Sequence, residues 1–130
     1  MTEMSWAYSP EPASCGRVRR DLQEFLGAFG IPADPTDVAL LIVNELASNA
    51  VDHARTLFGV IARITGGELW ISVTDGSDEP LQQRPIDPLA VRGRGLQMVD
   101  ALSDRWAVTV HERGKTVTAV LVVEDPDLRR

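Results

Sequence analysis

Three polar side chains stand four residues apart inside an otherwise apolar stretch, "LIVNELASNAVDHA", which covers residues 41–54. They are the carboxylate of Glu45, the amide of Asn49 and the imidazole of His53. At about 100° per residue, an α-helix places them along the border between its apolar and polar faces. Such a row is either the solvated edge of a buried helix or the working face of a site, where a bound molecule could contact it.

Further motifs could bind the parts of a nucleotide. Asp75 ends a predicted strand in "WISVTDGSDEP", and its carboxylate could accept a hydrogen bond from an amino group such as that of adenine. Residues 93–95, "GRG", stand at a predicted helix start, where backbone N–H groups and the helix dipole suit a phosphate. Thr116 follows "GK" in a late strand and offers a hydroxyl. Each feature alone is also common in ordinary turns, helix starts and strands.

Three helices are predicted to carry or support these residues. Ser14 can cap a first helix over about residues 15–28. Asp34 is the expected N-cap of a second helix, which should run to about Arg55. A third helix opens at residues 93–95. The second and third helices therefore hold most of the candidate site.

The strand signals predict two hairpins and one edge strand. Strands over roughly residues 57–65 and 68–75 are joined by the glycine pair at 66 and 67, a two-residue hairpin signal. Residues 105–123 read as a second hairpin, turning at Arg113-Gly114. Met4 to Tyr8 is a candidate short edge strand before the prolines that follow.

Residues 76–92, rich in proline, glutamine and charge, lack a regular period. A loop of this length in a small domain is usually functional or mobile. The order of elements is α-α-β-β-loop-α-β-β, which favours an α+β fold with helices layered on one face of a mainly antiparallel sheet.

Composition limits the class of protein. With 130 residues, the chain is expected to form a single domain over residues 1–130. Its net charge is −6, and no cluster of basic residues suggests direct nucleic-acid binding. No apolar run reaches membrane-spanning length, and Cys15 is the only cysteine, so neither a membrane segment nor a disulfide framework is expected. We expect a cytoplasmic protein.

The order and spacing of the motifs resemble the GHKL, or Bergerat-fold, ATPases. The chain carries Glu-x-x-x-Asn on a helix, Asp at a strand end, Gly-x-Gly-Leu at a helix start and Gly-Lys-Thr in a late strand. The stretches "NELASNAVDHA", "GRGLQMVDALSDRWAV" and "GKTVTAVL" are especially similar to actinobacterial members of the anti-sigma-factor serine kinases, the sporulation and general-stress regulators. The resemblance covers nearly the whole chain. It implies a two-layer α/β sandwich with a mixed, mainly antiparallel sheet covered on one face by helices, and residues 76–92 as an ATP lid.

The resemblance also implies a role for each motif. Asn49 would coordinate Mg²⁺, Glu45 would be the general base, and Asp75, supported by Thr116, would bind the adenine amino group. Packing or capping of the helix end explains His53 as well as a nucleotide contact does. A glycine directly follows Asp75, one position earlier than in the family pattern. ATP binding is still expected, and weak affinity or slow turnover would be consistent with this difference. The implied nucleotide-binding residues are Asn49, His53, Asp75, Gly76, Arg92, Gly93, Arg94, Gly95, Leu96 and Thr116.

The implied function is that of an anti-sigma factor and protein serine kinase. It would use ATP and Mg²⁺, bind a sigma factor, phosphorylate a serine of a STAS-type antagonist protein, and act as a homodimer. The alternative is an ATP-binding interaction module without significant kinase activity, since Glu45 and Asn49 are expected in both. The catalytic domain of a sensor histidine kinase is less favoured, because no dimerisation helix pair or phospho-acceptor segment is recognisable.

Overall fold

The computed structural model describes residues 2–76 and 93–123, with the backbone alone at residues 93–95. Within these ranges, five strands form one antiparallel sheet in the order β1-β2-β3-β5-β4. The strands are β1 (Thr2–Tyr8), β2 (Phe58–Thr65), β3 (Glu68–Asp75), β4 (Arg105–His111) and β5 (Gly114–Val122). The helices are α1 (Pro12–Ala28), α2 (Ala33–Asn49), a π-helical turn η1 (Ala50–Ala54) and α4 (Gly93–Leu102).

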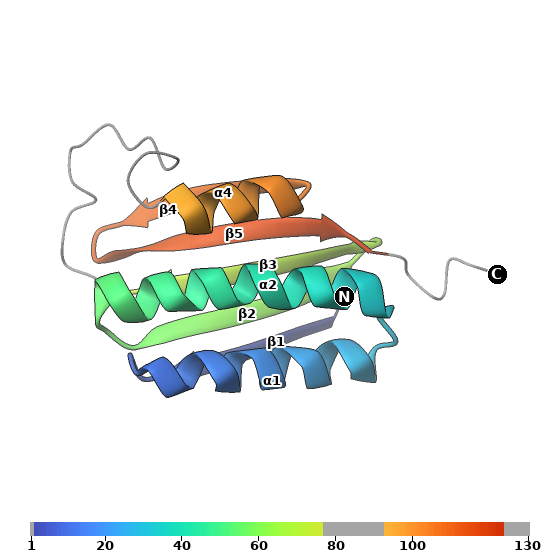
Figure 1. Ribbon diagram of the computed structural model, residues 1–130, viewed down its shortest axis with the longest axis horizontal. Helices are drawn as coiled ribbons and strands as arrows, with labels where there is room; N and C mark the ends of the chain where they lie inside the picture. Colours follow the sequence, from blue (N-terminus) through green and yellow to red (C-terminus); the bar gives the residue numbers. More distant parts are fainter. Residues whose placement is uncertain (1, 77–92, 124–130) are drawn as a thin grey trace.

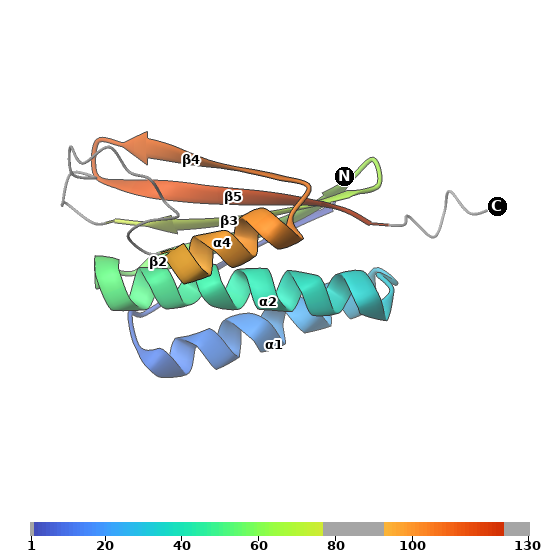
Figure 2. The same cartoon turned by 45° about the horizontal axis from the view of Figure 1, so that its top comes forward.

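The helices and the sheet form two layers. Helices α1, α2 and α4 lie on one side of the sheet, and in the described part of the chain no helix covers the other side (Figures 1 and 2). The predicted α+β sandwich is therefore confirmed, and all strand pairs among the described residues are antiparallel.

Strand β3 explains how the core forms between the layers. Its residues alternate between the two faces of the sheet, so that Leu69, Ile71 and Val73 point toward the helices and are buried. Helix α2 lies over β3 and β5 and contributes the buried side chains of Ala39, Ile42, Val43, Leu46 and Ala47. By the same alternation, Asp75 occupies the fourth position of an otherwise apolar buried row.

Both long helices begin earlier than predicted. Helix α1 starts at Pro12, and Ser14 is not its cap, because its hydroxyl donates to the carbonyl of Ser9 at 2.8 Å. Helix α2 starts at Ala33 after Pro32, so Asp34 lies in the first turn instead of capping it. In that place its charge still interacts favourably with the helix dipole.

The second helix changes type at its C-terminal end. The α-helical pattern ends at Asn49, and residues 50–54 form a π-helical turn in which the Arg55 N–H donates to the carbonyl of Ala50. Arg55, with a positive φ of 56°, closes the turn in the left-handed region. The predicted end of the second helix at about Arg55 is close to the observed end of the π-helical turn. The prediction that the helix is regularly α-helical up to that point is wrong, because the α-helical part ends at Asn49.

The hairpins follow the predicted pairings, with one shift. Strands β2 and β3 are joined by Gly66 and Gly67, both with positive φ, as predicted. The second hairpin pairs His111 with Gly114, so its two turn residues are 112 and 113. The predicted turn at Arg113-Gly114 is therefore displaced by one residue. The predicted edge strand is confirmed as β1, and the loop at residues 77–92 lies outside the described residues.

Candidate functional site

The C-terminal end of β3 carries a buried acidic side chain. Asp75 is 5% exposed, although it continues a row of apolar residues. Its Oδ2 atom lies 2.5 Å from the Nζ atom of Lys115, whose side chain is 14% exposed. A buried carboxylate needs such compensation, because an unpaired charge is very costly away from water. Lys115 is not among the binding residues predicted from the sequence motifs.

A glycine permits this close contact between β3 and β5. Gly114 has a φ of 115°, and a Cβ atom at this position would lie 2.0 Å from the carbonyl oxygen of Asp75. The next residue, Lys115, is the cross-strand partner of Asp75. Any larger residue at 114 would push the start of β5 away from the end of β3.

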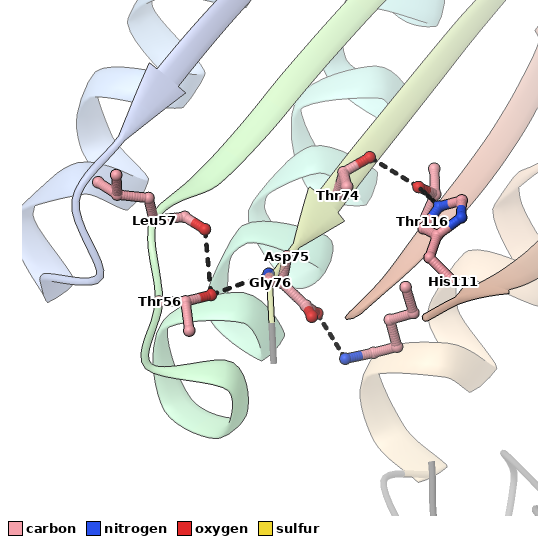
Figure 3. Close-up of polar contacts among 8 residues, drawn as sticks. Thr56, Leu57, Thr74, Asp75, Gly76, His111 and Thr116 are labelled. Carbon is pink, nitrogen blue, oxygen red and sulfur yellow. Dashed lines mark hydrogen bonds and ion pairs between the residues drawn. The ribbon is translucent and has the colours of Figure 1, made fainter. Parts of the chain in front are cut away.

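The segment that follows η1 also contacts the end of β3. The backbone N–H of Gly76 donates to the hydroxyl of Thr56 at 2.9 Å, and that hydroxyl lies 3.1 Å from the carbonyl oxygen of Leu57 (Figure 3). Gly76 is exposed. The connection between η1 and β2 is thus fixed to the residue directly after Asp75.

Of the three polar residues spaced four apart in the sequence, only the first two lie in the α-helical part of the second helix. Glu45 and Asn49 are half-buried and lie four residues apart within α2, so they share one face. His53 lies beyond Asn49 in the π-helical turn, where hydrogen bonds join residues five apart, and it is exposed. It therefore does not continue the four-residue spacing of the other two.

Thr116 lies on the opposite face of the sheet from the Asp75 side chain. It is the cross-strand partner of Thr74, and the two hydroxyl oxygens are 2.7 Å apart. The Nε2 atom of His111 is also 2.7 Å from the Thr116 hydroxyl (Figure 3). The structure thus brings Lys115, not Thr116, to the carboxylate of Asp75.

The glycine motif forms the start of a helix, as predicted. Helix α4 begins at Gly93, and Leu96 is half-buried within it. Arg92 and the side chain of Arg94 lie outside the described part of the structure. The first turn of α4 lies toward the same end of the molecule as η1, the end of β3 and the start of β5 (Figure 1). That end therefore gathers a buried carboxylate, a half-buried amide and the N–H groups of a helix start.

A comparison with protein families identifies this architecture. The family described as "Histidine kinase-like ATPase domain" matches residues 8–121. The chain belongs to the histidine kinase-like ATPase family. The GHKL resemblance inferred from the motifs is thereby confirmed, and an ATPase domain of this kind implies ATP binding.

A solved structure has the same fold as this ATPase domain. It is the crystal structure of the RsbU and RsbW domains of Rv1364c from Mycobacterium tuberculosis, with a TM-score of 0.75 and 21% sequence identity. The alignment covers 97% of this chain and 34% of that chain, so this chain spans about a third of its length. No curated protein matches the chain.

The residues of this ATPase domain fit a nucleotide that carries Mg²⁺. The carboxylate of Asp75 would be an acceptor for an amino group of a base, and the first turn of α4 would offer backbone N–H groups to phosphate. The amide oxygen of Asn49 is a suitable ligand for Mg²⁺, which keeps several waters and shares phosphate oxygens.

The described residues contain neither a cluster of metal-binding side chains nor a membrane-spanning helix. No group of three or more His, Cys, Asp or Glu side chains among them is arranged to hold a metal ion. Within the same residues, no helix combines the length and the apolar character that crossing a membrane requires.

Proposed function

We propose that this ATPase domain is an anti-sigma factor and protein serine kinase. It binds a sigma factor and transfers the γ-phosphoryl group of ATP to a serine of a STAS-type antagonist protein. Phosphorylation of the antagonist then decides which of the two proteins remains bound. The motif resemblance to that group of GHKL ATPases and the RsbW domain in the solved structure of the same fold support this assignment.

The observation that carries the nucleotide part of the proposal is the buried Asp75. A carboxylate in the fourth position of an apolar strand row is costly, so a buried acidic residue at a strand end is a candidate for binding a ligand. It ends a strand at the same end of the fold as the first turn of α4 (Figure 1). A base at Asp75 and phosphates at α4 are the two ends of one nucleotide.

The chemistry assigned to α2 depends on two residues one turn apart. Glu45 accepts the proton of the attacking serine hydroxyl, as a general base. Asn49 holds the metal through its amide oxygen, and Mg²⁺, when bound, neutralises the charge of the transferred phosphoryl group. Because both residues share one face of a rigid helix, their separation is fixed before the substrate arrives.

The direct test is phosphoryl transfer. The purified protein is incubated with γ-labelled ATP, Mg²⁺ and candidate STAS-type antagonist proteins, and label on a serine is located by mass spectrometry. We expect label with the wild-type protein and a rate at least about 100-fold lower with Glu45→Ala, as for loss of a general base. The antagonist with its acceptor serine changed to alanine is the control.

A second result would favour the alternative function. If the protein binds Mg-ATP and a sigma factor, but labels none of the antagonists, it is a nucleotide-dependent interaction module. Homodimer formation and a cytoplasmic location belong to the same proposal as the kinase function, and analytical ultracentrifugation and cell fractionation test them.

A further inference from the structure

The connection between η1 and β2, residues 55–57, contacts the residue that follows Asp75. The half-buried side chain of Thr56 places its hydroxyl between two backbone groups (Figure 3). This hydroxyl accepts from the N–H of Gly76 at 2.9 Å and donates to the carbonyl of Leu57 at 3.1 Å. A hydroxyl can do both at once, because it has a donor as well as acceptor lone pairs. Serine could make the same two bonds at this position, whereas valine could make neither.

Thr56 lies where the ladder between β2 and β3 ends. The last pair of the ladder is Phe58 with Asp75. Hydrogen-bonded and non-hydrogen-bonded pairs alternate along an antiparallel ladder, starting from the hydrogen-bonded pair that closes the two-residue turn. By that alternation, the next hydrogen-bonded pair would join Leu57 and Gly76. The Thr56 hydroxyl bridges these two residues in place of a direct backbone hydrogen bond, and so fixes the chain directly after Asp75.

A second hydrogen bond continues this connection to the end of α2 that carries Asn49. The Arg55 N–H donates to the carbonyl of Ala50 at 3.2 Å and closes the π-helical turn. Ala50 directly follows Asn49, and Arg55 directly precedes Thr56. Two hydrogen bonds therefore link the residue after Asn49 to the residue after Asp75.

We propose that Thr56 is a positioning residue, which holds the end of β3 at a fixed separation from the end of α2. This inference rests on the proposed function, in that Asp75 and Asn49 bind the base and the metal of one Mg-nucleotide. A ligand held at both places binds well only if their separation is already correct, because otherwise binding must also order the protein. ATP without Mg²⁺ lacks the contact through the metal and depends less on that separation.

The test measures the affinity for ATP in the wild-type protein, Thr56→Val and Thr56→Ser. Mg-ATP is titrated by calorimetry, and ATP in EDTA is titrated by NMR, which measures millimolar dissociation constants. Valine keeps the shape of the side chain without the hydroxyl, and Thr56→Val should weaken Mg-ATP at least about fivefold. The same variant should reduce the gain in affinity from Mg²⁺ at least about threefold. Thr56→Ser should keep both quantities within about twofold of the wild-type values, because it retains the hydroxyl.

A matched control removes a hydroxyl elsewhere on the sheet. Thr109 is exposed on β4, and Thr109→Val should leave the affinity for Mg-ATP and the gain from Mg²⁺ unchanged. Circular dichroism verifies that each variant is folded, and urea denaturation measures its free energy of unfolding. A hydroxyl that serves stability alone would lower the free energy of unfolding in Thr56→Val and leave the affinity for ATP as it is.

That result would overturn the inference and leave the proposed function standing. Equal weakening of ATP with and without Mg²⁺ would also overturn it, because Thr56 would then act on the end of β3 alone. A Thr56→Ser variant that binds as weakly as Thr56→Val would show that the hydroxyl is not the cause. A wild-type protein that does not bind Mg-ATP would overturn the proposed function itself.

A further measurement tests the bridge without any ligand. Amide hydrogen exchange of Gly76 is followed by NMR in the wild-type protein and in the two variants of Thr56. The Gly76 N–H loses its acceptor in Thr56→Val and should exchange at least about threefold faster, whereas Thr56→Ser should retain the wild-type rate. An equal exchange rate in Thr56→Val and the wild-type protein would contradict the bridge on which the proposal depends.

Discussion

Asp75 is an acidic residue in a buried apolar row, and the ionic contact with Lys115 offsets the cost of that position. Thr116, the next residue of β5, points to the other face of the sheet and bonds to Thr74. Successive strand residues face opposite sides, so one step along β5 decides which side chain reaches the carboxylate. The sequence "GKT" does not reveal this, because the strand register depends on pairing with β3.

Glu45 and Asn49 should respond differently to substitution. Asn49→Ala should remove the Mg²⁺-dependent part of nucleotide affinity, because the metal loses its protein oxygen ligand. Glu45→Ala should leave Mg-ATP binding largely intact, because the carboxylate acts on the acceptor serine. Calorimetric titrations of ATP with and without Mg²⁺ measure both effects. Equal loss of binding in the two variants would refute the roles assigned here.

The raised pKa of the Tyr8 phenol predicts that the free energy of unfolding changes at high pH. Its hydroxyl donates to Oδ2 of Asp21 at 2.6 Å, and burial, together with that hydrogen bond to Asp21, raises the pKa of the phenol above its usual 10.0. A group with a raised folded-state pKa contributes stability that is complete below the unfolded pKa and is lost as pH rises through the folded one. The free energy of unfolding should therefore fall as pH rises above about 10.

Urea denaturation of Tyr8→Phe provides the control for this effect. The variant should be less stable at neutral pH by about 1–2 kcal/mol, since Asp21 loses its hydrogen bond. It should lack the part of the alkaline stability loss that arises from Tyr8. An identical pH dependence in both proteins would exclude Tyr8 as the cause.

At the scale of elements, the hairpin of β4 and β5 is fixed at one point against β3. The register pairs Asp75 with Lys115, and Gly114 allows the two backbones to approach. Helix α2 brings Glu45 and Asn49 to the same end before its π-helical turn redirects the chain into β2. The candidate site therefore depends on the contact between the end of β3 and the start of β5, and on the C-terminal end of α2. The backbone conformation fixes the geometry at both places.

Gly114→Ala tests this close approach. The added Cβ atom would lie 2.0 Å from the Asp75 carbonyl oxygen, and φ is 115°, so we expect a loss of more than about 2 kcal/mol in the free energy of unfolding. Gly27→Ala is the matched control, because a Cβ atom there meets nothing within 4 Å in helix α1. That change should stabilise the protein by about 0.5–1 kcal/mol. Urea denaturation that finds the two variants equally stable would contradict the structure of this hairpin.

The elements that local signals specify were predictable from the sequence. The glycine pair 66–67 requires positive φ at both positions and marked the first hairpin, and alternation marked β3. The helix starts were less predictable, because Ser14 and Asp34 resemble caps while Pro12 and Pro32 lie at the true starts. The π-helical turn at residues 50–54 has no residue signature, since tertiary packing decides where an extra residue is accommodated.

At the scale of the whole molecule, helices α1, α2 and α4 of the described residues lie on one side of the sheet, and the element ends that carry the candidate site lie at one end of the two layers (Figures 1 and 2). The central claim is that this end binds a nucleotide, with the base at Asp75. A ligand that binds only the folded state must also stabilise it, so Mg-ATP should raise the melting temperature in a concentration-dependent way.

Calorimetric titration of Mg-ATP into the wild-type protein, Asp75→Asn and Asp37→Asn tests that claim most directly. Asp37 is exposed in the first half of α2, so its substitution removes the same charge far along the helix from Asn49. The wild-type protein and Asp37→Asn should bind with the same affinity, and Asp75→Asn should bind more weakly by about 1–3 kcal/mol, since an amide is a poorer acceptor than a carboxylate. Circular dichroism of each variant verifies that it is folded. Equal affinity of folded Asp75→Asn and the wild-type protein would contradict a base site at Asp75.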